Sequence, residues 1–152
     1  MLAASLIAFG HFLAFFALTA ALVLQLALIG GPLGVDIARR IRRADRAAGL
    51  SAVLVLVFGF LRVFQFERGS DYYFSNVFFA FKLSLFVIAA VISLFPTTRY
   101  LRWNRELAQG IAPQIDAATV QRIKSAIHWQ LVMIMGILLC ASLMAKGLGS
   151  LQ

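Results

Sequence analysis

The chain has 152 residues, 62% of them hydrophobic, and a mean hydropathy of +0.90. A soluble domain of this size could not cover so much apolar surface, so the composition excludes an ordinary soluble fold and predicts an integral membrane protein. The formal net charge of +8 would indicate a nucleic-acid partner in a soluble protein. Here the arginines cluster beside apolar segments, as cytoplasmic loops do, so we expect the lipid bilayer as partner and no nucleic acid.

The motif content excludes several kinds of chemistry. The single cysteine, Cys140, cannot form an intrachain disulfide, and no Cys-x-x-Cys-His sequence for covalent c-type haem attachment occurs. The sequence also has no glycine-rich phosphate loop, no zinc-ligand spacing and no paired carboxylates within an apolar segment. The sequence therefore contains none of these residue patterns for catalysing hydrolysis or phosphoryl transfer.

The first part of the chain predicts a membrane helix. Residues 1–35 carry no charged side chain, and they lack the basic start and short apolar core of a cleavable signal peptide. We expect a transmembrane helix over about residues 2–29, ended by the glycines and Pro32 that follow. Asp36 then begins an arginine-rich amphipathic segment, which runs into a second apolar helix over about residues 47–66.

Two further membrane helices are predicted in the second half. The first covers about residues 73–95, where Pro96 should end it, and a short surface helix is expected near residues 101–108. Asp116 is a suitable N-cap for the last helix, over about residues 117–147. The predicted fold class is therefore all-α, a single-domain integral membrane four-helix bundle.

The charge distribution predicts how this bundle sits in the membrane. Four helices alternate in direction, so the two arginine-rich loops fall on one side and the polar turn at residues 67–71 falls on the other. Short loops rich in lysine and arginine stay in the cytoplasm. We expect a multi-pass protein of the bacterial inner membrane with cytoplasmic basic loops and periplasmic N- and C-termini.

Three polar side chains lie at similar depths in the apolar helices. Counted from the outer helix ends at 1.5 Å per residue, His11 and Lys82 each lie ~14 Å deep and Arg62 lies ~6 Å deep. An imidazole, an ammonium and a guanidinium should therefore converge in the outer half of the bundle. Gly10 and Gly59 are near the same level, where we expect them to leave room for a flat ligand.

This set of side chains fits a haem b pocket. Imidazole is an ordinary axial ligand of haem iron, so His11 is the candidate metal ligand. Arg62 could pair with a propionate in a bidentate fashion, and Lys82 could bind a propionate or move a proton as a catalytic residue. The function predicted is a haem b-binding redox protein that performs electron transfer or porphyrin-linked oxidation.

Other interpretations remain for each residue. His11 could make a hydrogen bond between helices, and Arg62 could extend to the membrane interface. Lys82 could also extend to the interface, or it could pair with Glu67 or Asp71. The second candidate function is a non-catalytic membrane subunit or small carrier whose cationic pocket holds an anion, a quinone or a partner helix. A homo-oligomer or a redox partner in the membrane would fit either function.

A second histidine allows a weaker interpretation, copper handling. His128 and Met135 share a helix face, and these two residue types can bind copper. His128 lies ~28 Å from the outer end of its helix, about 14 Å from the level of His11, so one haem could not use both histidines. We expect His128 to be an interface residue.

Several short motifs together carry a family resemblance. They are Ala44-Asp45 with Gly49, Gly59-x-x-Arg62, Glu67-x-Gly69, Tyr72-Tyr73, Asn76, Phe79-x-x-Lys82-Leu83, Ser93-x-x-Pro96-Thr97 and Met144-Ala145-Lys146-Gly147, in addition to His11. In this combination the chain resembles an uncharacterised family of four-helix bacterial proteins described as predicted membrane proteins. The likeness covers nearly the whole chain.

That family is distantly similar to the HemJ-type protoporphyrinogen oxidases and to the membrane domain of copper resistance protein D. In HemJ-type proteins a histidine of the first helix ligates haem b, and a lysine in a Lys-Leu pair of the third helix is needed for activity. These features fall on His11 and on Lys82-Leu83 of this sequence. The resemblance thus implies haem b as cofactor, with His11 as its ligand and Lys82 as a functional residue.

The predicted orientation can be tested with reporter fusions at Gly34, Ser70, Gln109 and Gln152. A reporter that works only in the cytoplasm should be active when it is fused at Gly34 or Gln109, because the basic loops orient the helices. A reporter that works only in the periplasm should be active when it is fused at Ser70 or Gln152. A periplasmic reporter at Gln109 would contradict this topology and the depths counted from it.

Overall fold

The computed structural model describes residues 2–66 and 75–149, which form helices and their connections. The elements are α1 (Leu2–Ile29), α2 (Val35–Leu61), the π-helix η1 (Arg62–Phe66), α4 (Val77–Arg102), α5 (Asn104–Ala108) and α6 (Ala117–Ala145). Four helices are long and apolar enough to cross a membrane. The protein is therefore an all-α membrane bundle, as the sequence predicted, because a chain in lipid must satisfy its backbone hydrogen bonds within each segment.

The second helix includes the basic segment as well as the apolar one. α2 begins at Val35, well before the apolar run that starts near residue 47, and Asp36 lies in its first turn. A carboxylate near a helix N-terminus interacts favourably with the helix dipole. Ala38 and Ile41 are fully buried on one face, whereas Arg39 is exposed. The basic segment is thus an amphipathic first part of a continuous membrane helix.

The prediction that Pro96 ends the third helix is wrong. α4 continues through a buried Pro96 to Arg102. Proline is tolerated inside membrane helices because neighbouring groups can satisfy the carbonyl that it leaves without a partner. The helix begins at Val77 rather than near residue 73. Its N-cap is Asn76, whose side chain accepts a hydrogen bond from Phe78 N at 3.0 Å.

The last helix starts where the sequence predicted. Asp116 is the N-cap of α6, and its carboxylate accepts hydrogen bonds from Thr119 Oγ1 at 2.6 Å and Thr119 N at 2.8 Å. Both hydrogen bonds hold the pKa of the Asp116 carboxyl below its usual value, and the bond from the Thr119 hydroxyl has the larger effect. α6 ends at Ala145, slightly before the predicted end. The short helix α5 begins at Asn104 rather than near residue 101.

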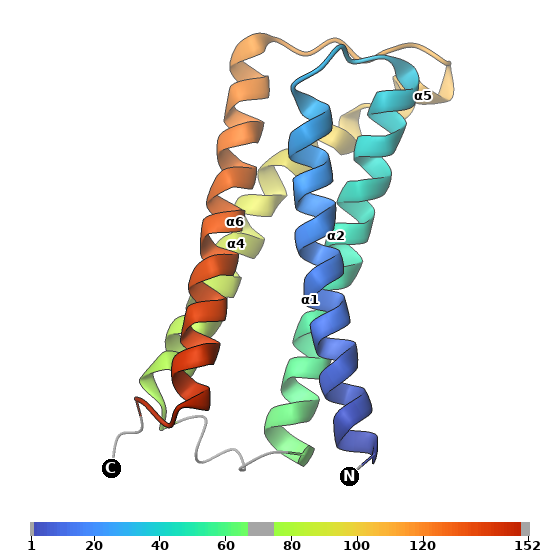
Figure 1. The fold of residues 1–152 in the computed structure, drawn as a ribbon. Coiled ribbons are helices and arrows are strands. Elements are labelled where there is room, and N and C mark those ends of the chain that lie inside the picture. The colour runs from blue at the N-terminus through green and yellow to red at the C-terminus, as the bar shows by residue number, and fades with distance from the viewer. Residues whose placement is uncertain (1, 67–74, 150–152) are drawn as a thin grey trace.

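The helices pack in two pairs, α1 with α2 and α4 with α6, and α1 also contacts α6 (Figure 1). The main hydrophobic core lies toward the end of the bundle that carries α5. Its most buried members are Ile41, Tyr100, Ile123 and Ile127. Toward the other end, where Leu2 and Ala145 lie, the two pairs spread apart (Figure 1).

Both basic segments lie at the same end of the bundle. Arg39 Nη2 donates a hydrogen bond to the Leu107 carbonyl oxygen at 3.2 Å, which joins the first basic segment to α5 in the second. Arg42 is buried in the same region, and Trp103 packs there against the ring of Tyr100. The protein therefore has one strongly cationic, well-packed end and one loosely packed end.

Candidate functional site

A large cavity opens between the helix pairs at the loosely packed end. Its volume is about 660 Å³, which lies within the range of about 300–1,000 Å³ of small-molecule and cofactor sites. His11, Arg62 and Lys82 all line it. The sequence predicted that these side chains converge, and the structure brings them together around this cavity. Much of the remaining wall is aromatic, with Phe12, Phe15, Phe60, Phe79 and Phe86.

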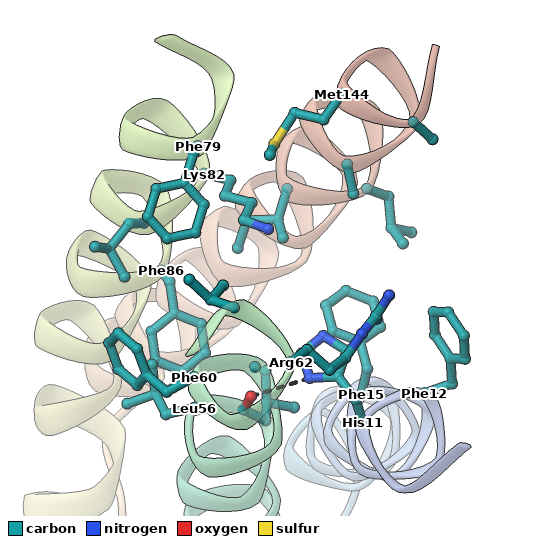
Figure 2. A pocket seen from close by; sticks show the side chains of 18 residues that line it. His11, Phe12, Phe15, Leu56, Phe60, Arg62, Phe79, Lys82, Phe86 and Met144 are labelled. Carbon is teal, nitrogen blue, oxygen red and sulfur yellow. Dashed lines mark hydrogen bonds between the residues drawn. The ribbon is translucent and has the colours of Figure 1, made fainter. Parts of the chain in front are cut away.

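The two walls of the large cavity carry different groups. Figure 2 shows His11 and Arg62 on the side formed by α1, α2 and η1, with Lys82 and Met144 on the side formed by α4 and α6. Lys82 follows the start of α4 at Val77 by only five residues, or about 8 Å, so it is less deep in its helix than the predicted ~14 Å. The cations therefore face the cavity from separate helix pairs.

The imidazole of His11 has a defined tautomer when it is neutral. His11 Nδ1 lies 3.1 Å from the Val55 carbonyl oxygen, and it must be the donor because a carbonyl oxygen only accepts (Figure 2). The lone pair of the neutral ring is then on Nε2. Histidines that ligate metals commonly donate their other ring N–H to a backbone carbonyl in this way.

The expectation that Gly10 and Gly59 leave room for a flat ligand is wrong for Gly10 but not for Gly59, which lines the large cavity. A Cβ at Gly10 would lie 3.0 Å from the Phe58 ring, and one at Gly59 would lie 3.3 Å from His11 Cε1. The space beside Gly10 is thus taken by the Phe58 ring. Gly59 allows the His11 ring to lie directly against α2, so its role is to seat the imidazole.

Arg62 stands where the α-helix changes to a π-helix. η1 begins at this residue, and π-helical turns occur frequently at functional sites. The guanidinium carbon lies 5.3 Å from the centroid of the Phe12 ring on α1. A cation at this distance from an aromatic face is attracted to it. The contact holds Arg62 beside His11, across the groove between η1 and α1.

Lys82 makes a similar contact on the opposite wall. Its Nζ lies 5.0 Å from the centroid of the Phe79 ring, and the side chain is half-buried. The predicted alternative partners, Glu67 and Asp71, lie outside the described residues. Among the described residues that line the large cavity there is no carboxylate. The charged groups that the structure shows around it are therefore positive.

Met144 is a cavity residue that the sequence did not indicate. It is buried, lines the large cavity and packs with Val63 and Phe79. The sequence motif Met144-Ala145-Lys146-Gly147 drew attention to this region but gave the methionine no role. A thioether can serve as an axial ligand of haem iron together with a histidine.

The second histidine lies elsewhere. His128 is exposed on α6, its Nδ1 donates to the Lys124 carbonyl oxygen at 2.8 Å, and it does not line the large cavity. Met135, which shares its helix face, is 66% exposed. Within residues 2–66 and 75–149, no three histidine, cysteine or acidic side chains form a group that could hold a metal ion. Nothing in this geometry adds support to the copper interpretation.

Comparison with known proteins identifies a family. The family described as "Predicted membrane protein (DUF2214)" matches residues 3–149, which is nearly the whole chain. No curated protein and no solved structure matches the chain. The distant similarity to HemJ-type oxidases and to copper resistance protein D therefore stays an expectation from the sequence.

The contact of the His11 ring with Gly59 can be tested without a bound ligand. Gly59→Ala should shift the imidazole by a few tenths of an ångström, because the new methyl group would lie 3.3 Å from His11 Cε1. With only two histidines in the chain, the ¹⁵N resonances of labelled histidine report the change directly.

Gly49→Ala is the matched control, since a Cβ at Gly49 would have no other group within 4 Å. It should leave the His11 resonances unchanged and keep or raise thermal stability, because alanine favours a helix interior by about 1 kcal/mol over glycine. Equal effects of the two substitutions would contradict the role given to Gly59.

Proposed function

The chain belongs to the DUF2214 family of predicted membrane proteins, and we propose that it is a haem b-binding redox protein whose cofactor occupies the large cavity. One observation supports this most: His11 lines a cavity of about 660 Å³ while its Nδ1 donates to the Val55 carbonyl oxygen. That hydrogen bond leaves Nε2 of the neutral ring as the atom that could bind iron.

The other cavity residues fit the same cofactor. Aromatic side chains would cover the porphyrin faces, and the guanidinium of Arg62 would pair with a propionate through two N–H groups. Lys82, on the opposite wall, would bind a second carboxylate or hold a proton there. The thioether of Met144 could supply a second ligand to the iron. When bound, the haem iron would supply one-electron redox chemistry.

Within this proposal the protein residues have three tasks. His11 positions the cofactor because its ring is fixed between Gly59 and the Val55 carbonyl. Arg62 and Lys82 would neutralise the propionate groups of the haem, which are otherwise costly to place in an apolar membrane region. The apolar wall excludes water from the porphyrin, which raises the strength of these charge interactions.

We also propose a bacterial inner-membrane location with both basic segments in the cytoplasm. The support is that arginines of both segments gather at one end of the bundle, where Arg39 contacts the carbonyl of Leu107. Positive charge in short loops remains cytoplasmic. The large cavity would then lie in the periplasmic half.

A second candidate function keeps the cavity but not the haem. The large cavity has cations on both walls and an otherwise mostly apolar lining, which would suit an amphipathic anion or a quinone in a non-catalytic carrier or subunit. The visible spectrum of the protein purified from haem-replete cells distinguishes the two. A bound haem gives a Soret band that sharpens and shifts on reduction, whereas a colourless protein with quinone extractable from it would favour the carrier.

His11→Ala should abolish the Soret band while the protein still inserts into the membrane. Loss of a ligand should cost more than the roughly 10–100-fold in affinity that loss of its hydrogen-bonding partner costs. His128→Ala is the matched control and should leave the spectrum nearly unchanged, because His128 does not line the large cavity. An unaltered spectrum in His11→Ala would reject His11 as the ligand.

Lys82→Met keeps an unbranched side chain of similar length and removes its charge. If Lys82 binds a propionate, haem affinity should fall by about tenfold or more, because a hydrogen bond to a charged group contributes about 1.5–3 kcal/mol. Haem titration in detergent measures this, and Lys124→Met, which is remote from the large cavity, is the control.

Two other outcomes would assign Lys82 differently. If Lys82→Met leaves the haem affinity, the stability and the turnover with an artificial electron acceptor unchanged, Lys82 is a residue of the membrane interface. Lost stability that is partly restored by also neutralising Glu67 or Asp71 would mean an ion pair.

A further inference from the structure

A second, smaller cavity lies between the helices nearer the basic end. Its volume is about 90 Å³, and all four membrane helices contribute a polar side chain to its wall. These are Gln25 of α1, Asp45 of α2, Ser93 and Thr97 of α4, and Gln130 of α6. The rest of the wall is apolar and includes small residues of α2 and α4. A polar ring of this kind within an apolar bundle is costly unless its groups are satisfied.

One of these groups indicates what occupies the small cavity. Gln25 is 1% exposed, and among the described residues its Nε2 has no hydrogen-bond partner. Buried polar groups without a protein partner are normally satisfied by ordered water. At about 30 Å³ per molecule, a cavity of 90 Å³ holds about three waters. The small cavity is therefore large enough and polar enough to be hydrated.

Asp45 connects this cavity to the basic end. It is half-buried, and its Oδ1 accepts a hydrogen bond from Thr97 Oγ1 at 2.8 Å. In the described part of the chain, Arg42 of its own helix and Tyr100 of α4 are the ionisable groups that interact with it. The hydroxyl of Tyr100 is itself buried without a described partner.

The two cavities share part of their walls. Phe15, Phe86 and Ile137 line both, so these three side chains from α1, α4 and α6 stand between the small and the large cavity. An apolar constriction of this type excludes water unless it moves. His11 and Lys82, both able to accept or release a proton, lie in the large cavity beyond it.

We infer that the small cavity is a water-filled proton path that leads from Asp45 to the large cavity, with Phe15, Phe86 and Ile137 as its barrier. The half-buried Asp45 carboxylate takes a proton from water at the basic end and gives it to the adjacent water of the small cavity, while that water passes one of its own protons to the next. The final acceptor is a group in the large cavity, which releases a proton on the opposite side of the membrane. No bond other than O–H or N–H changes, and no oxidant is required. The path does not depend on haem.

Proton flux into proteoliposomes tests this path directly. With a trapped pH dye and a potassium gradient clamped by valinomycin, the wild-type protein should conduct little because the barrier is closed. Phe86→Ala should raise the proton flux by about tenfold, equivalent to a barrier lowered by about 1.4 kcal/mol. The potassium-driven flux is read without any haem, so the result is independent of the proposed cofactor.

Double variants test whether the proton flux passes through the small cavity. Phe86→Ala combined with Asp45→Asn, or with Gln25→Met, should return the flux to the wild-type level, because the carboxyl or the water-binding amide is lost. Phe81→Ala is the matched control, since Phe81 is on the same helix but 60% exposed on the outside of the bundle. It should conduct no more than wild type.

Two results would overturn the inference. One is a Phe86→Ala flux no higher than that of Phe81→Ala, and the other is a raised flux that persists after Asp45→Asn. If Phe86→Ala does not fold, Ile137→Ala removes less volume from the same barrier and carries the same expectations. A colourless protein that still shows the Asp45-dependent flux would reject the haem proposal and keep the proton path.

Discussion

The large cavity exists because the four helices pack closely at only one end. Large side chains such as Ile41, Tyr100 and Ile127 fill the interior near the basic segments, whereas the described residues at the other end form a small cluster around Phe79 and Met144. Protein interiors are normally filled as densely as organic crystals. A space of about 660 Å³ is a large departure from that density in so small a bundle, and it is big enough for a small-molecule ligand or cofactor.

The charged groups limit which ligands would suit the large cavity. Arg62 and Lys82 are each held against an aromatic ring, Phe12 and Phe79, and a cation–π contact of this type offsets part of the cost of placing a cation in an apolar region. The same contacts keep both charges at the cavity wall. An amphipathic anion would satisfy the charges and the apolar wall together. The proposed haem b would do so with its porphyrin and propionates, and a smaller anionic ligand would do so in a carrier.

The two cavities carry different polar groups. The large one has cations among aromatic rings, and the small one has amides, hydroxyls and a carboxylate in a mostly apolar wall. Phe15, Phe86 and Ile137 form part of the wall of both cavities. In the proposed proton path these side chains would keep the water of the small cavity out of the large one, and protons would pass when they move.

The sequence by itself determined the membrane class, the four apolar segments, the Asp116 cap and the convergence of His11, Arg62 and Lys82 in one half of the bundle. These depend on local properties, because hydropathy, capping chemistry and a fixed rise per residue need no knowledge of the neighbours. Two local expectations failed. Pro96 does not end its helix, which continues to Arg102, and Lys82 lies about 8 Å rather than ~14 Å into that helix because α4 begins at Val77.

Only the tertiary structure decided which groups face one another around each helix. It placed Met144 in the large cavity, Gln25 in the small one, and the ring of Phe58 in the space beside Gly10 that was expected for a ligand. In a soluble helix, polar and apolar faces reveal the rotation, but a membrane helix is apolar on the side that meets lipid as well as on the side that meets protein. The rotation of each helix is therefore set by packing against its neighbours, which the pattern of a single segment does not contain.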